Sequence, residues 1–123
     1  MKNIIHPIDI VGELLSEVAF VQDYIQLRFD GASLTFYSHP LIKTDWFDGK
    51  YPDSGSRDAL CSLIGKEVSS VQLDDEKELV LVFKPNDVVT LPLDWESRTP
   101  WGEAMLFSGR EGGRRRYTPV QVW

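Results

Sequence analysis

The sequence contains one apolar pattern twice, and this repetition constrains the fold more than any other feature. The segments Asp23–Ser38 (DYIQLRFDGASLTFYS) and Glu78–Leu93 (ELVLVFKPNDVVTLPL) align at an offset of 54 residues. In both segments apolar residues recur at every second position, which is the period of a β-strand with one buried face. A turn-rich break, DGAS or KPND, divides each segment into two such runs. Each segment therefore predicts a β-hairpin.

The pattern extends upstream of both hairpins. The apolar pairs aligned within the hairpins are Ile25 with Leu79, Leu27 with Leu81, Phe29 with Phe83, and Leu34 with Val88. The pairs aligned upstream, at an offset of 53, are Gly12 with Gly65 and Val18 with Val71. These matches predict two three-stranded meanders, with strands at Leu14–Val21, Tyr24–Asp30, Ser33–Tyr37, Glu67–Leu73, Glu78–Lys84 and Val88–Leu91. Because a lone meander leaves one apolar face open, we expect the two to cover each other's faces or to join edge to edge.

The segment between the two meanders predicts a short helix. Ser56 is a suitable N-cap and Gly65 a suitable C-terminal stop, so the helix is expected at about Arg57–Ile64. A chain of 123 residues is expected to form one domain. Its predicted class is α+β, mainly antiparallel β, with two three-stranded meander repeats and one short helix between them. The expected parts are repeat 1 at about 12–38, a loop and helix at 39–65, repeat 2 at about 66–93, and a C-terminal tail at 94–123.

The tail differs from the body in charge. The net charge is −6, but the first 97 residues carry 8 basic and 17 acidic groups, or −9, and the remainder carries 5 Arg and 2 Glu, or +3. The tail therefore folds onto the acidic body or faces a different partner. An acidic chain disfavours nucleic acid and anionic membranes as partners. The tail is also expected to contain a short helix starting near Thr99 and a closing edge strand within Tyr117–Trp123.

Compartment is predicted from cysteine content and hydropathy. The single cysteine, Cys61, excludes an intrachain disulfide and fits a reducing compartment. The longest uncharged stretch, residues 31–42, has 12 residues, whereas a membrane-spanning helix needs about 20. The sequence therefore predicts a cytoplasmic protein without a membrane partner.

The residues able to carry catalysis or bind metal are scattered. His6 and His39 each precede a proline and belong to no metal-ligand spacing. Cys61 is expected on the apolar side of the helix, where a thiol acts as a small hydrophobe; a nucleophilic Cys61–His39 pair is the alternative. The acidic run 74–78 is expected in a solvated turn, and the arginines 114–116 are expected to be solvated or folded onto the body. We therefore predict no catalytic, metal or cofactor site, and a protein that is not an enzyme.

Two segments carry a resemblance to known sequences. VQDYIQLRFDGASLTFYSHP at 21–40 and LCSLIGKEVSSVQLDDEKELVLVF at 60–83 resemble a family of small bacterial proteins of unknown function, which carry a DYxQLxFDGxxLxxY segment followed by LxGxxVxxV. The resemblance covers about residues 12–93. It implies no activity and no catalytic residue. Small bacterial proteins of this build often resemble immunity or accessory proteins of toxin systems, which is an analogy of fold class.

Aromatic residues outside the strands of the two predicted repeats provide the functional hypothesis. They are Trp46, Phe47, Tyr51, Trp95, Trp101, Phe107, Tyr117 and Trp123. They either cover the core or line a groove for a partner, and the candidates for partner binding are Trp46, Tyr51, Trp95 and Trp101. The predicted function is a non-enzymatic protein-binding module, with a toxin-neutralising immunity protein and a basic partner as its specific form. The alternative is a small-ligand-binding domain with an aromatic-lined pocket, and a homodimer through the sheet edges stays open.

Overall fold

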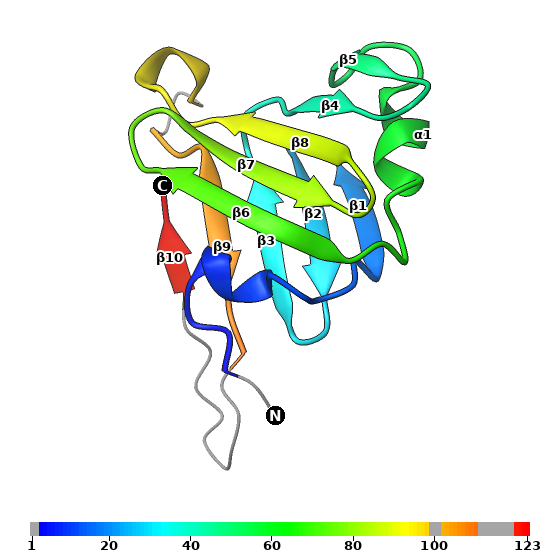
Figure 1. The fold of residues 1–123 in the computed structure, drawn as a ribbon. Coiled ribbons are helices and arrows are strands. Elements are labelled where there is room, and N and C mark those ends of the chain that lie inside the picture. Colours follow the sequence, from blue (N-terminus) through cyan, green and yellow to red (C-terminus); the bar gives the residue numbers. More distant parts are fainter. Residues whose placement is uncertain (1–2, 99–101, 111–119) are drawn as a thin grey trace.

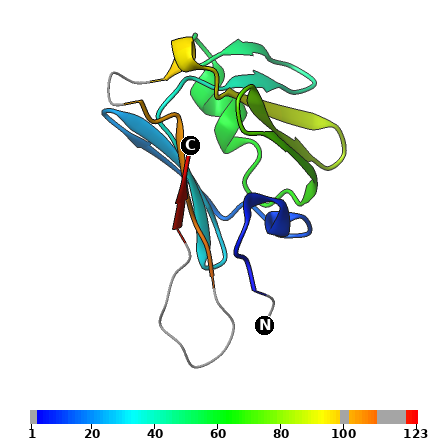
Figure 2. The ribbon, with the colours of Figure 1, turned by 90° about the vertical axis from the view of Figure 1, so that its left-hand side faces the viewer.

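The fold consists of two antiparallel β-sheets in two layers (Figures 1 and 2). The computed structural model describes residues 3–98, 102–110 and 120–123. The first sheet has the strand order β1 (Glu17–Val21), β2 (Tyr24–Phe29), β3 (Ala32–Phe36), β9 (Met105–Ser108) and β10 (Val120–Val122). The second has the order β5 (Asp48–Lys50), β4 (Leu41–Lys43), β8 (Asp87–Pro92), β7 (Glu78–Phe83) and β6 (Val68–Asp74). The prediction of a mainly antiparallel β domain with little helix is confirmed at this level.

Three short helical segments complete the described chain. They are η1 (Pro7–Ile10), α1 (Ser56–Cys61) and η2 (Trp95–Ser97). The predicted helix is present but shorter than expected, and Gly55, rather than Ser56, occupies its N-cap. The prediction that Cys61 faces the core is wrong, because Cys61 is exposed while Leu60 and Leu63 are buried. Consecutive helical residues lie about 100° apart round the axis, so when Leu60 faces the core the next residue, Cys61, is turned toward solvent.

The inner faces of both sheets contribute to one core. The strands alternate as predicted, and in β7 each second residue is buried. The largest side chains of the core come from both layers: Leu27, Leu34, Phe36 and Phe107 from the first sheet, and Leu79, Leu81, Phe83 and Leu91 from the second. Of the two expected arrangements, the structure therefore has the face-to-face one.

The observed strand register shows that one of the residue pairs aligned between the two predicted repeats is wrong. Val18 lies opposite Leu27, and Val71 lies opposite Leu81, as the offset of 53 requires. Leu34 also lies opposite Leu27, but the residue opposite Leu81 is Val89. The pairing of Leu34 with Val88 is therefore wrong by one residue. The cause is the hairpin loops, which have two residues between β2 and β3 and three between β7 and β8.

A local twofold arrangement joins the two halves at one corner. Leu14 and Glu67, which are 53 residues apart, face each other in an isolated β-bridge. The bonds on either side come in matched pairs: Gly12 N donates to Val68 O (2.8 Å) and Gly65 N to Leu15 O (2.7 Å), and Leu15 N donates to Lys66 O (3.1 Å) and Val68 N to Glu13 O (3.0 Å). Because this segment pairs across the corner, β1 begins at Glu17 rather than at the predicted Leu14.

The two matched glycines have the same unusual backbone conformation, and this yields a prediction. Gly12 has φ +90° and Gly65 has φ +89°, and a Cβ on either would meet no atom within 4 Å. Gly12→Ala and Gly65→Ala should therefore each lower the free energy of unfolding by about 1 kcal/mol, through backbone strain alone. Urea denaturation measures both values. Asparagine at the same positions is the control and should cost less, and a large difference between the two alanine variants would contradict the equivalence of the two turns.

The last strands of each half cross to the opposite sheet. β4 and β5 follow β3 along the chain but extend the sheet of β8, and β9 and β10 follow β8 but extend the sheet of β3. The loop predicted within residues 39–65 thus contains the hairpin of β4 and β5, and the predicted closing edge strand is β10. These crossovers bring residues 37–40 and 93–98 to the same end of the two layers (Figure 1).

The described part of the basic tail contacts the acidic body. Nη1 of Arg110 donates to the backbone oxygen of Asp30 (2.6 Å) and to its carboxylate (3.1 Å), and Nη2 lies 3.5 Å from a carboxylate oxygen of Glu13. This agrees with a tail folded onto the body. The arginines 114–116, Trp101 and the helix predicted near Thr99 lie outside the described residues.

Candidate functional site

The crossovers enclose a surface hollow, which we call the crossover hollow. It has a volume of about 350 Å³ and is lined by Tyr37, Ser38, His39, Lys50, Pro92, Glu96, Ser97 and Arg98. A smaller hollow of about 50 Å³ adjoins it and shares Tyr37, Ser38 and His39. The lining therefore comes from three separate segments: the β3–β4 connection, the end of β5, and the end of β8 with η2.

Backbone bonds hold the floor of the crossover hollow. Tyr37 N donates to Ala104 O (2.8 Å), and the buried Ser38 hydroxyl donates to Pro92 O (2.8 Å). Tyr51 N donates to Pro40 O (3.0 Å). Because these bonds tie the β3–β4 connection to both sheets, the hollow is part of the folded framework rather than of a free loop.

Two cations and one carboxylate line the crossover hollow. Nε of Arg98 donates to Leu93 O (2.9 Å) and Nη1 donates to Gly102 O (3.2 Å). These carbonyls fix the guanidinium without neutralising its charge. The Lys50 ammonium forms no ion pair with any residue that the structure describes. Glu96 contributes the opposing charge.

An aromatic cluster borders the smaller hollow. The Tyr51 ring stacks on Phe20 (6.1 Å between centroids) and meets His39 edge-on (5.7 Å). The Arg57 guanidinium lies 5.0 Å from the centre of the Tyr51 ring, and its Nη2 donates to the Tyr51 hydroxyl (3.2 Å). A cation over an aromatic face is attracted by the ring quadrupole. These contacts attach the start of α1 to β1 and hold Tyr51 in place.

Tyr37 lines both hollows, and the pKa of its hydroxyl is shifted. Its ring meets Tyr24 edge-on, with 6.0 Å between centroids. Burial raises the pKa of the Tyr37 hydroxyl above its ordinary value, and the nearby Glu103 and Tyr24 raise it further. At neutral pH the Tyr37 hydroxyl therefore stays protonated and able to donate a hydrogen bond.

The raised pKa of Tyr37 predicts a loss of stability in alkali. Below the ordinary pKa of 10.0 the hydroxyl is neutral in the folded and the unfolded chain, so it adds no pH dependence. Above this value the unfolded chain loses the proton first, and stability falls until the folded hydroxyl also ionises. Tyr37→Phe should therefore flatten the fall in unfolding free energy above about pH 10, as measured by urea denaturation. An unchanged pH profile in this variant would contradict the assignment.

Of the four aromatic residues predicted to bind a partner, the three that the structure describes do not lie at one place. Tyr51 lines the smaller hollow, and Trp95, which precedes the lining residue Glu96, is 76% exposed. Trp46 is 57% exposed and packs edge-on against Phe47. Trp46 lies beyond Lys43, which pairs with Val88 near the start of β8, whereas Trp95 follows the end of β8. The fourth residue, Trp101, lies outside the described residues.

Of the other predicted candidates, His6 and the acidic run share one neighbour, because the rings of His6 and Trp123 meet edge-on (6.5 Å between centroids) and Asp75 also contacts Trp123. His6 caps η1, where its Nδ1 accepts from Ile8 N (3.1 Å). His39 lines the crossover hollow, and no hydrogen bond joins it to Cys61 in the part of the chain that the structure describes. In the acidic run 74–78, Asp75 accepts a hydrogen bond from the indole of Trp123 (2.7 Å). The alternative of a Cys61–His39 pair therefore has no support in the geometry.

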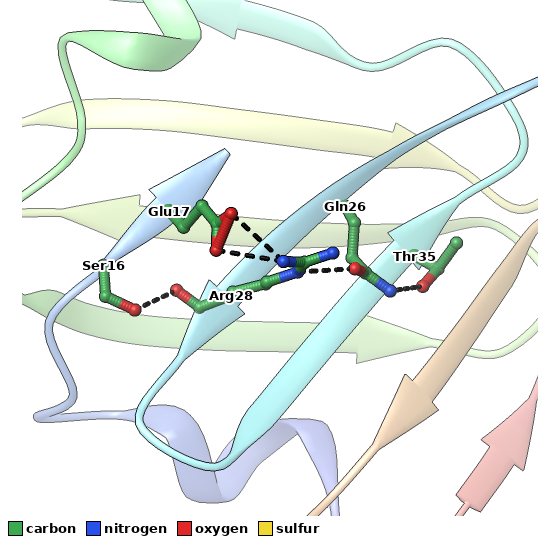
Figure 3. Close-up of polar contacts among 5 residues, drawn as sticks. All are labelled: Ser16, Glu17, Gln26, Arg28 and Thr35. Atoms are coloured by element: carbon green, nitrogen blue, oxygen red, sulfur yellow. Dashed lines mark hydrogen bonds and ion pairs between the residues drawn. The ribbon is translucent and has the colours of Figure 1, made fainter. Parts of the chain in front are cut away.

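A polar ladder crosses the outer face of the first sheet (Figure 3). Nη1 of Arg28 donates to both carboxylate oxygens of Glu17 (3.0 Å each), and its Nε donates to Gln26 Oε1 (2.6 Å). Gln26 Nε2 donates in turn to the Thr35 hydroxyl (3.0 Å). The ladder ties β1, β2 and β3 together with side chains. Since its charges satisfy each other, this face offers little to a ligand.

Comparison of the chain with protein-family models, with curated proteins and with solved structures finds no match. No helix in the described residues has the length and apolar character that crossing a membrane requires. Within residues 3–98, 102–110 and 120–123, no group of three or more His, Cys, Asp or Glu side chains is arranged to hold a metal ion.

Proposed function

We propose that the chain is a non-enzymatic binding domain that holds a small ligand in the crossover hollow. The observation that supports this is the convergence of three chain segments on one hollow of about 350 Å³, held by backbone bonds. Pockets that bind small ligands have volumes of about 300–1,000 Å³ and carry a few fixed polar groups. Here Arg98 and Tyr37 are such groups. The proposal takes up the small-ligand alternative predicted from the sequence, and it is supported by Tyr37 in the crossover hollow and by Tyr51 in the smaller one.

A thermal-shift screen against small metabolites tests the proposal. A ligand should raise the melting temperature of the wild type, because binding to the folded state alone stabilises it. Ser97→Phe places a ring in the hollow and should abolish this rise. Ser54→Phe, in an exposed turn, is the matched control and should retain it. If Ser97→Phe retains the full shift, the ligand binds elsewhere and the proposal is wrong.

A second candidate is a protein-binding module, the form predicted first from the sequence. It is favoured by Trp95, which is 76% exposed, because tryptophan is enriched at the energetic centre of protein interfaces. The acidic body would steer a basic partner, and an immunity role in a toxin system is its specific form. Protection of cells on co-expression with a basic toxin, lost in Trp95→Ala, is the expected result under this candidate.

We also propose that the two halves are copies of one unit. The supporting observations are the bonds at offset 53 around Leu14 and Glu67, and the common backbone of Gly12 and Gly65. In a duplicated unit of this kind, each copy gives its last two strands to the sheet of the other. The crossover hollow then lies where one of these exchanges takes place.

A further inference from the structure

We infer that the ligand of the crossover hollow carries an oxyanion, a carboxylate or a phosphate, bound between Lys50 and Arg98. The inference rests on the proposed function and specifies its chemistry. The hollow contains two permanent cations and one carboxylate, in a chain whose first 97 residues carry a charge of −9. Positive charge therefore accumulates locally against the overall trend.

Five described cations, Lys43, Lys50, Arg57, Lys77 and Arg98, form no ion pair with another described residue, and two of these five line the crossover hollow. Arg28, Lys66, Lys84 and Arg110 each pair with a carboxylate of the chain. Within the described residues, neither Lys50 nor Arg98 has such a pair. The chain pairs four of its cations with its own carboxylates, whereas two cations without such a pair line the same hollow. A bound anion would supply the negative charge that these two cations lack.

The guanidinium of Arg98 is already oriented for this role. Its Nε and Nη1 are held by the carbonyls of Leu93 and Gly102, at 2.9 and 3.2 Å. Carbonyl acceptors hold the plane of the group but leave its positive charge uncompensated. Because arginine binds carboxylate and phosphate through directed N–H groups, a held guanidinium loses little conformational entropy when an anion arrives.

Neutral donors in the lining add to the binding of an oxyanion. Tyr37 has a hydroxyl that is protonated at neutral pH, as a tyrosine with its ordinary pKa already is, and burial raises this pKa further. His39 contributes a ring N–H, and its ring is steadied by Tyr51 at 5.7 Å. The Ser97 hydroxyl donates to Asp94 (2.9 Å), so Ser97 contributes shape rather than a donor. The aromatic rings beside the smaller hollow favour an anion attached to a planar group.

Substitution of Glu96 distinguishes an anionic ligand from a cationic one. An anion in the hollow is repelled by this carboxylate, so Glu96→Gln should tighten anion binding several-fold. A cationic ligand would use Glu96 as its partner, and the same substitution would weaken its binding. The direction of the change in affinity thus identifies the charge of the ligand, since the substitution keeps the shape of the side chain.

The test is a titration of the full chain followed by backbone amide NMR. The probes are phenyl phosphate, benzoate and inorganic phosphate, with phenol as the neutral and benzylamine as the cationic comparison. We expect the two aromatic anions to shift the amides of residues 37–39 and 96–98, and Lys50→Gln to weaken this binding about tenfold. Lys43→Gln, which removes the same charge from the neighbouring strand, should leave the affinity unchanged. Added salt should weaken binding in the wild type.

The other possible results of the titration would each contradict one part of the inference. If phenol or benzylamine shifts the same amides as strongly as the anions, the hollow binds ligands but the oxyanion inference is wrong. If Lys43→Gln weakens binding as much as Lys50→Gln, only the overall charge matters and the assignment to Lys50 is wrong. If no probe shifts these amides, the inference is overturned, and the metabolite screen with Ser97→Phe then decides the proposed function separately. The amide spectrum of each variant shows whether it is folded.

Discussion

Replacing Phe83 by alanine is expected to lower the free energy of unfolding by about 3 to 5 kcal/mol. Phe83 is the last residue of β7, and its ring is fully buried between the two sheets. The substitution removes the apolar surface of the ring and leaves a cavity that the packed neighbours fill only in part. Val82→Ala is the control, since Val82 is half-exposed on the other face of the same strand, and should cost less than about 1.5 kcal/mol.

Phe29→Ala should give a loss of similar size from the other layer. Phe29 is buried in β2 at the position aligned with Phe83, and both belong to one core cluster. Because the two sheets share this core, each variant should unfold in one cooperative transition, at a lower urea concentration than the wild type. Two separate transitions in either variant would show that the meanders are stabilised independently, and would contradict the account of the fold.

The central strands could be predicted because their pattern is long and regular. Tyr24–Phe29 and Glu78–Phe83 each alternate over six residues, with inward side chains that are apolar throughout. Their ends were predicted to within one residue. A one-residue shift would turn the whole apolar set toward water, so a sequence with this alternation permits few registers.

The crossing strands β4, β5 and β9 could not be predicted because they are short. β4 and β5 have three residues each, and β9 has four. A period of two needs more positions than this to be distinguished from chance. The partner of β4 is also more than forty residues away, since Leu41 pairs with Thr90. No local pattern in the sequence indicates which distant strand pairs with β4.

The crossover hollow was missed for the same reason. Tyr37, Lys50 and Arg98 are far apart in the sequence, and only the crossings of the chain bring them together. One sign was present, since the charge changes from acidic to basic at Arg98. The aromatic residues were partly informative: Tyr51 lines the smaller hollow and Trp95 precedes the lining residue Glu96, while Trp46 lies near the other end of β8. The sequence identifies charged and aromatic residues that could bind a ligand, but the chain topology determines which of them lie at the same site.

Lys66→Met is expected to lower the free energy of unfolding by about 2 kcal/mol. Lys66 pairs with Asp87, whose side chain is 5% exposed at the start of β8. Removing the ammonium leaves a buried carboxylate without its partner, and in fully buried pairs this costs about 3 to 5 kcal/mol. The Lys66 side chain is 35% exposed, so water screens part of the interaction and the expected loss is smaller.

A double-mutant cycle separates the buried charge from the lost contact. Asp87→Asn keeps the shape of the side chain and an oxygen that accepts from Lys66, so alone it should cost about 1 kcal/mol. In a chain that already carries Asp87→Asn, Lys66→Met should cost less than it does in the wild type, because no buried charge is left unpaired. The four unfolding free energies, measured in urea, should therefore show a coupling of about 1 kcal/mol or more. Additive losses would mean that Asp87 is solvated in the folded chain, and that the corner joining the two halves is stabilised by the matched backbone bonds of Gly12 and Gly65 without help from this ion pair.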